Sequence, residues 1–219
     1  MKRYLIRLIR YFYRKGLKNN RDLTLITNNC IGGVIYHDMQ LKFMSPTINL
    51  YFSNSDFITF CINLKEYLNT EIKEYTRHDK KFPVGIIEGG GKGDVLVYFM
   101  HYNSFSDAKN KWNERIKRVN YENLFIIMES QIDTEEHLLK FNDIPFKNKV
   151  LLTNGKSHRI LSSFPISSKF YNQNYYPGKL LMYPKNGLIR YLEQFDYVYF
   201  FNTGKIRKRR FLVNYENNM

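Results

Sequence analysis

The chain of 219 residues has little of several features that would identify a class of protein at once. Its two cysteines, Cys30 and Cys61, are too few for a disulfide framework and form no CxxC motif. No apolar run approaches the roughly 18 residues that a membrane-spanning helix needs. The first segment lacks an apolar stretch followed by small residues, so we do not expect a secretory signal. These absences predict a protein of the cytoplasm.

The chain does contain enough apolar material for a sizeable core. Hydrophobic residues make up 43% of it and aromatic residues 16%, which excludes a disordered or collagen-like chain. The length fits one ordinary domain with short appendages. We predict a basic amphipathic helix over residues 1–20, a single α/β domain over residues 21–204 and a basic tail over residues 205–219.

The positive charge is concentrated at the two ends. Residues 1–21 contain eight Lys or Arg and no acidic residue, and residues 205–219 contain five basic residues and one acidic residue. The two ends therefore carry twelve of the fourteen net positive charges, and residues 22–204 are nearly neutral. Because a nucleic-acid groove needs basic residues spread over one face, we predict no nucleic-acid partner.

An amphipathic pattern runs through the first segment. At about 100° per residue, four arginines share one face of a helix and four apolar side chains share the opposite face. The arginines are Arg3, Arg7, Arg10 and Arg14, and the apolar residues are Leu5, Leu8, Ile9 and Phe12. Such a helix either lies on an anionic membrane surface or packs on the body of the protein, and both interpretations stay open. The KIRKRR run after Gly204 is more typical of a solvated tail.

Apolar runs alternate with helical patterns along the body. The runs predict strands at 23–27, 48–52, 82–87, 94–101, 124–128, 149–153 and 197–201. Helices are predicted from about Val34 and at 56–68, 104–119, 134–141 and 187–194. Continuously apolar strands are typical of a sheet that is covered on both faces. The fold class that we predict is a three-layer α/β/α arrangement around a mostly parallel sheet.

Polar residues follow the first strand, where the carboxyl ends of parallel strands form the crevice of an open α/β sheet. Asn28, Asn29 and Cys30 stand there, directly ahead of a helix. Free N–H groups and the dipole at a helix N-terminus lower the pKa of a thiol. The strand that begins at Asp94 delivers His101 to the same edge. We therefore predict that Cys30 and His101 form a nucleophile–base pair.

The other polar groups at this edge have supporting roles in that prediction. Asn28, Asn29, Gly32 and Gly33 would stabilise an oxyanion. Plainer interpretations stay open, because a lone cysteine after a strand is often a small buried hydrophobe. A histidine at a strand end is equally often a structural hydrogen-bonding residue.

The helix expected over 104–119 carries cations on one face. Lys111, Arg115 and Arg118 recur at helical spacing beside Trp112, and such a face either binds a phosphate or is simply solvated. The EGGGKG segment lacks the spacing of a P-loop and is predicted to be a mobile loop. No HExxH, paired-histidine set or DxD is present, so no metal site is predicted.

The string TNNCIGG at 27–33, followed by Tyr36, resembles the opening of a bacterial family known as domain of unknown function 1919. The resemblance continues in order through SPT at 45–47, FPVG at 82–85, FMHY at 99–102 and FKNKV at 146–150, and it covers residues 22–202. Members of this family are named after exopolysaccharide or capsule biosynthesis, some of them as acetyltransferases. Members commonly have an aromatic residue where this chain has Ile31.

The resemblance implies a three-layer α/β fold and a role in surface-polysaccharide synthesis. We expect an O-acyltransferase that acts on a glycan or a lipid-linked sugar, with acetyl-CoA or another acyl donor as co-substrate and no tightly bound cofactor. The residues expected to contact substrate or its phosphates are Ser45, Tyr102, Trp112, Arg115, Arg118 and Thr153. A glycosyl- or phosphosugar transferase and a non-enzymatic, membrane-associated scaffold are the alternatives.

Overall fold

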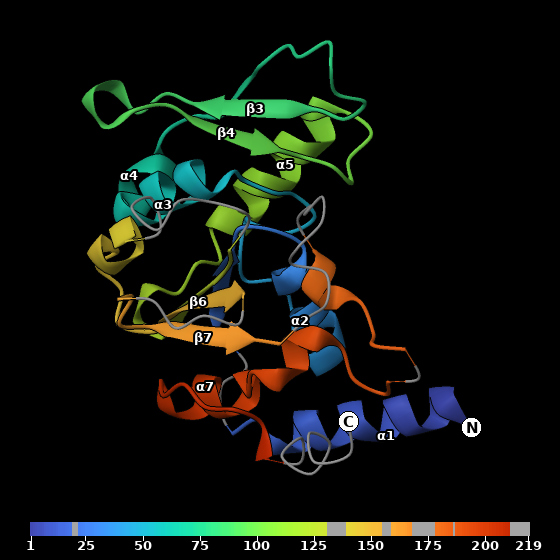
Figure 1. Ribbon diagram of the computed structural model, residues 1–219. Coiled ribbons are helices and arrows are strands. Elements are labelled where there is room, and N and C mark those ends of the chain that lie inside the picture. Colours follow the sequence, from blue (N-terminus) through green and yellow to red (C-terminus); the bar gives the residue numbers. More distant parts are fainter. Residues whose placement is uncertain (19–21, 131–138, 155–158, 168–177, 186, 211–219) are drawn as a thin grey trace.

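A four-stranded parallel sheet forms the centre of the protein (Figure 1). The computed structural model describes residues 1–18, 22–130, 139–154, 159–167, 178–185 and 187–210. The sheet contains β1 (Thr24–Thr27), β5 (Leu124–Glu129), β6 (Lys149–Asn154) and β7 (Ser163–Ile166), in the order β1-β5-β6-β7. All three neighbouring pairs are parallel. This arrangement confirms the predicted α/β class and the parallel sheet.

Helices cover both faces of this sheet, because successive side chains of a strand point to opposite faces. Leu25 and Phe125 point to one face, which is covered by α2 (Ile31–Met39), α7 (Tyr197–Thr203) and α1 (Lys2–Gly16). Ile26 and Ile126 point to the other, which is covered by α3 (Asn54–Ile62), α4 (Leu64–Asn69) and α5 (Phe105–Ile116). Two apolar cores result, one on each face.

A second, antiparallel sheet lies outside α3 and α5, at the end of the molecule opposite α1 (Figure 1). It contains β2 (Lys73–Glu74), β3 (Val84–Ile87) and β4 (Val95–Tyr98), in that order. We expected the strands at 82–87 and 94–101 to join the parallel sheet, and that part of the prediction was wrong. An apolar run indicates a buried strand, but it does not indicate the sheet to which the strand belongs.

Two further apolar runs are not strands. The run at 48–52 makes only an isolated bridge between Tyr51 and Tyr98, and the run at 197–201 forms most of α7. Short 3₁₀ segments lie at Gly90–Lys92, Tyr121–Asn123, Lys140–Asp143, Lys179–Leu181 and Tyr191–Gln194. The last of these replaces the helix predicted at 187–194, and most of the helix predicted at 134–141 lies outside the described residues.

The N-terminal helix forms as predicted but packs on a different face. Arg10 and Tyr13 are buried against α2 and α7, so a member of the arginine face points into the protein. The Arg10 guanidinium pairs with Asp38 at 3.0 Å and with Glu193, and those two buried carboxylates explain its inward position. Among the described residues, no helix is both long and apolar enough to cross a bilayer.

Candidate functional site

The turn between β1 and α2 is held by its own side chains. The Thr27 hydroxyl donates to the carbonyl of Asn29 at 2.8 Å and accepts the amide of Gly32 at 3.2 Å. A Cβ at Gly32 would lie 2.7 Å from the Thr27 Oγ1, so glycine is required at this close approach. The side-chain oxygen of Asn29 accepts the amide of Ile31 at 3.0 Å. The turn is therefore rigid where it presents Asn29 and Cys30.

Tyr36 fixes α2 beneath the strand that precedes this turn. Its hydroxyl donates to the carbonyl of Leu23 and accepts the amide of Leu25, both at 2.9 Å. The tyrosine of the family-like string therefore has a structural role. It ties the helix to β1, so that the N-terminus of α2 stays at the carboxyl end of the sheet.

Asn28 joins β1 to β5 through its side chain. The amide nitrogen donates to the carbonyl of Glu129 at 2.9 Å, and the amide oxygen accepts the backbone N–H of Glu129 at 2.9 Å. The side chain is completely buried. The expected role of Asn28 in an oxyanion site is therefore not supported by its position, because both ends of its amide extend the pairing of the two strands.

Glu129 is the residue of this region that sequence reasoning missed. It ends β5 and is 0% exposed. Its carboxylate accepts the side-chain amide of Asn29, the backbone N–H of Gly178 at 3.0 Å and that of Leu180 at 3.2 Å. A buried carboxylate is stable only with such donors. The available signal was an acidic residue directly after a five-residue apolar run.

Cys30 is half-buried at the carboxyl end of β1, as the N-cap residue of α2. Burial, and then the nearby Glu129 carboxylate, raise the pKa of the Cys30 thiol to about 11. We expected the helix N-terminus to lower this pKa, and that expectation was wrong. Removing the thiolate from water and placing it beside a carboxylate both disfavour its negative charge.

The segment that carries His101 lies beside Cys30, but it follows β4 of the antiparallel sheet, whereas we expected a strand of the parallel sheet. The Cys30 Sγ lies 3.9 Å from the Sδ of Met100, the residue before His101. His101 itself is exposed, in the turn that follows β4. Within the described part of the chain, the polar contact of the thiol is with Met100 and not with the imidazole. The structure thus brings the two segments together without a Cys30–His101 hydrogen bond.

Arg115 on α5 and Arg118 just after it contact other groups of the protein. The Arg115 guanidinium donates to the Tyr102 hydroxyl at 2.7 Å and lies 5.3 Å above the ring of Phe43. Arg118 donates to the carbonyl of Phe43 at 3.1 Å and pairs with Glu114. These contacts fasten the segment after α2 to α5. They correct the expectation that Arg115 and Arg118 bind the phosphates of a donor.

Other residues expected to contact substrate lie inside the protein. Trp112 is 1% exposed and belongs to the core under the antiparallel sheet. Ser45 is completely buried, and its hydroxyl lies 3.0 Å from that of Thr47, which accepts the amide of Thr27. Both residues are therefore structural. Thr153, at the end of β6, is also buried.

Tyr102 and Gly33 lie closer to the surface than these residues. The Tyr102 hydroxyl donates to the carbonyl of Ile48 at 3.2 Å, and its ring is half-buried. A Cβ at Gly33 would meet Asn49 and Ile48 at ordinary contact distance. Of the residues expected at this edge of the sheet, Cys30, His101 and Gly33 are accordingly at least partly accessible, whereas Asn29 is buried against Glu129.

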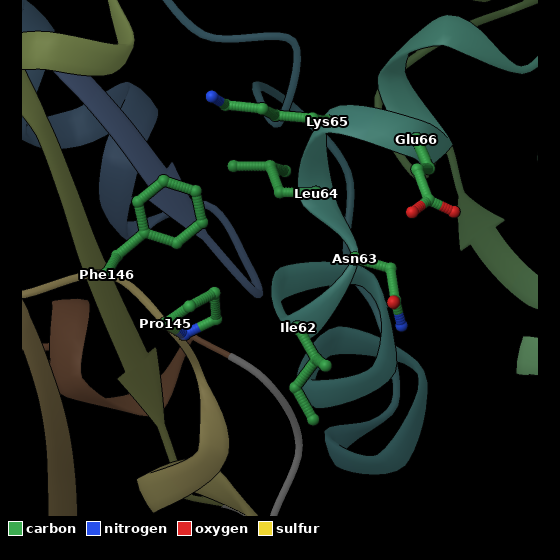
Figure 2. A pocket seen from close by; sticks show the side chains of 7 residues that line it. All are labelled: Ile62, Asn63, Leu64, Lys65, Glu66, Pro145 and Phe146. Carbon is green, nitrogen blue, oxygen red and sulfur yellow. The ribbon is translucent and has the colours of Figure 1, made fainter.

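A separate hollow of about 330 Å³ lies at the junction of α3 and α4. In Figure 2, Pro145 and Phe146 face Ile62 and Leu64 across it, while the Glu66 carboxylate points away. Pro145 and Phe146 lead into the amino end of β6, so this hollow is at the opposite end of the parallel sheet from Cys30. Its polar side chains are engaged elsewhere, since Glu66 pairs with Lys92. It is not the candidate site.

Two comparisons connect the chain with known proteins. The family model described as "Domain of unknown function (DUF1919)" matches residues 1–202. A protein of Haemophilus influenzae, described as "Uncharacterized protein", is 36% identical over 197 residues, which cover 88% of this chain and 92% of that protein. Neither description states a reaction, a ligand or a partner.

Proposed function

The chain belongs to the family described as domain of unknown function 1919, and we propose that it is a transferase of bacterial surface-polysaccharide synthesis. The best support is the group of residues at the carboxyl ends of β1 and β5. There a partly buried thiol stands over a buried carboxylate, and the segment that carries an exposed histidine contacts the thiol. Strand ends are where open α/β sheets bind their ligands.

The proposed reaction is the direct transfer of an acyl group to a sugar hydroxyl. With a pKa near 11, about one Cys30 thiol in ten thousand is ionised at pH 7, which disfavours a covalent thioester intermediate. Cys30 then lines the site as a neutral thiol. This differs from the nucleophile that we expected from the sequence.

His101 acts as the general base in this scheme. Its imidazole takes the proton of the sugar hydroxyl as the hydroxyl oxygen attacks the acyl carbon of a thioester such as acetyl-CoA. The carbon–sulfur bond breaks, and the imidazolium returns the proton to the departing thiolate. Backbone amides near Gly33 stabilise the oxyanion that forms in between, whereas both ends of the buried Asn29 amide are engaged by Glu129 and Ile31.

We place the protein in the cytoplasm, on the inner face of the cell membrane, where lipid-linked sugars are assembled. The acceptor is then a glycan or a lipid-linked oligosaccharide. We no longer assign Arg115 and Arg118 to the phosphates of the donor, because both contact other protein groups. The two alternatives are a glycosyl- or phosphosugar transferase and a scaffold without a reaction of its own. They predict different changes in the polymer.

Deletion of the gene, followed by NMR of the purified surface polysaccharide, tests the proposal. We expect the loss of one acetyl signal with the sugar backbone unchanged. Loss of a sugar residue would replace acyl transfer by glycosyl or phosphosugar transfer, and loss of all polymer would favour the scaffold. An unchanged polymer would overturn the polysaccharide setting altogether.

A further inference from the structure

The N-terminal helix leaves a row of apolar side chains in contact with solvent. Five of the eight large apolar side chains exposed among the described residues belong to the first twelve residues of the chain. They are Met1, Tyr4, Leu8, Tyr11 and Phe12. Their spacing of three or four residues places them on one side of α1. Tyr4 is 70% exposed and Phe12 is 62% exposed, so most of the surface of each residue is open to solvent.

The opposite side of α1 is fixed to the protein, which determines the direction in which this row points. The Tyr13 ring packs edge-on against Tyr197 at 5.8 Å, and Arg10 pairs with Asp38 and Glu193. The Arg14 guanidinium donates to the carbonyl of Asp38 at 3.2 Å. Because these contacts immobilise the inner side, the exposed row cannot turn inward to complete the core.

The structure also brings the two basic ends of the chain together. Asn202 accepts the amide of Lys18 at 2.9 Å and donates to the carbonyl of Gly16 at 2.8 Å. The Arg209 guanidinium lies 4.0 Å from the centre of the Tyr13 ring. The segment that follows α7 therefore meets α1 at the end of the molecule opposite the antiparallel sheet (Figure 1).

In the described parts of the two ends, residues 1–18 and 204–210, the exposed side chains include several cations and no Asp or Glu. The exposed cations in these two segments are Lys2, Arg3, Arg7, Lys15, Lys18, Lys205 and Arg210. The first 21 residues contain no Asp or Glu, and twelve of the fourteen net positive charges of the chain belong to the two ends. The exposed surface of the described residues at this end is therefore both apolar and positively charged, and the carboxylates beneath it are buried in pairs with arginines.

We propose that this end docks on an anionic lipid bilayer, with α1 lying in the plane of the interface. The apolar row enters the boundary between headgroups and acyl chains, and the surrounding lysines and arginines contact anionic headgroups. Tyrosines in the row are typical of such interfaces, because their rings have an apolar body and a polar tip. The proposal goes beyond the transferase chemistry and does not depend on it.

Charge selects the bilayer over a second copy of the chain. Two copies that met through this face would place their clusters of positive charge against each other, and like charges repel. An anionic bilayer instead offers charge of the opposite sign over an area wider than the helix. At about 1.5 Å per residue, the 15 residues of α1 extend for roughly 22 Å along such a surface.

Sedimentation of the full-length protein with lipid vesicles tests the proposal. Vesicles of phosphatidylcholine alone are compared with vesicles that contain phosphatidylglycerol in addition. We expect binding to the anionic vesicles, at least tenfold weaker binding to the neutral ones, and weaker anionic binding in high salt. Equal binding to both kinds of vesicle, or binding to neither, would overturn the proposal.

Paired variants test which side of α1 is responsible. Tyr4→Ser combined with Phe12→Ser removes two exposed rings, and we expect it to reduce anionic binding at least tenfold. The matched control, Leu161→Ser combined with Met182→Ser, removes exposed apolar side chains elsewhere and should leave binding unchanged. Equal loss in both variants, or none in either, would contradict the assignment. Concentration-dependent dimerisation that the α1 variant abolishes, without vesicle binding, would assign the face to a second copy.

Discussion

At the scale of single residues, the Glu129 carboxylate helps to determine whether the Cys30 thiol is ionised and can act as a nucleophile. The sequence predicted correctly that Asn29 and Cys30 stand between a strand and a helix. It could not predict Glu129, whose donors Gly178 and Leu180 belong to a segment that is distant in the chain. When that carboxylate is not known, a thiol at a helix N-terminus is expected to have a lowered pKa. In the structure, burial and Glu129 raise the pKa of Cys30 instead.

Alkylation of Cys30 measures this pKa directly. Because only the thiolate reacts, we expect the rate of iodoacetamide labelling to rise about tenfold per pH unit from pH 7 to pH 10. Cys61, which is completely buried, should react only after unfolding. A plateau of the Cys30 rate near pH 8 would show an activated thiol and would contradict the direct-transfer scheme.

Two variants separate the contribution of Glu129 from general damage to the fold. Glu129→Gln removes the carboxylate charge and should shift the labelling profile of Cys30 to lower pH. Glu122→Gln, at an exposed position in the 3₁₀ segment before β5, should leave the profile unchanged. The raised pKa also means that the folded state holds this proton more tightly than the unfolded chain. The stability that it contributes should therefore be lost as the pH rises from about 9 to about 11.

At the scale of elements, α7 shows why an apolar run can mislead. Five consecutive aromatic or β-branched residues, 197–201, have high strand propensity, yet they form a helix. The Asp196 carboxylate accepts the amide of Tyr199 at 3.2 Å at the start of the helix, and Gly204 adopts a left-handed conformation at its end. These caps and the packing on Phe125 outweigh the local preference.

Two substitutions of Asp196 separate what its helix cap and its ion pairs each contribute to the free energy of unfolding. Asp196→Asn keeps an acceptor for the amide of Tyr199 but removes the charge that faces Arg207, at 2.7 Å, and Arg209, at 3.3 Å. Asp196→Ala removes both. We expect each variant to lower the free energy of unfolding in urea, with alanine costing about 1 kcal/mol more than asparagine.

Asp79→Asn is the control for that comparison. It disrupts an exposed pair with Arg77 and should leave the free energy of unfolding nearly unchanged. If the asparagine and alanine variants of Asp196 were equally stable, the cap would not be what holds this helix.

At the scale of the whole molecule, the proposed catalytic crevice and the basic end are separate features of one layered fold. The sequence predicted the parallel sheet, since the largely apolar runs at 23–27, 124–128 and 149–153 form β1, β5 and β6. It placed β3 and β4 in the wrong sheet, because burial does not specify a hydrogen-bonding partner. It located the charge at both ends of the chain, but only the packing of α1 beside α7 brings those ends to one side.

The acetyl content of the surface polysaccharide in strains that carry point variants tests the central claim most directly. A strain that lacks the gene is complemented with the wild-type protein, with His101→Ala or with His78→Ala, at matched protein levels. His78 is also exposed but lies before β3, in the loop after β2. We predict that His101→Ala reduces the acetyl signal to less than a tenth of the wild-type value, and that His78→Ala restores it fully. A full acetyl signal with His101→Ala would contradict catalysis at this crevice.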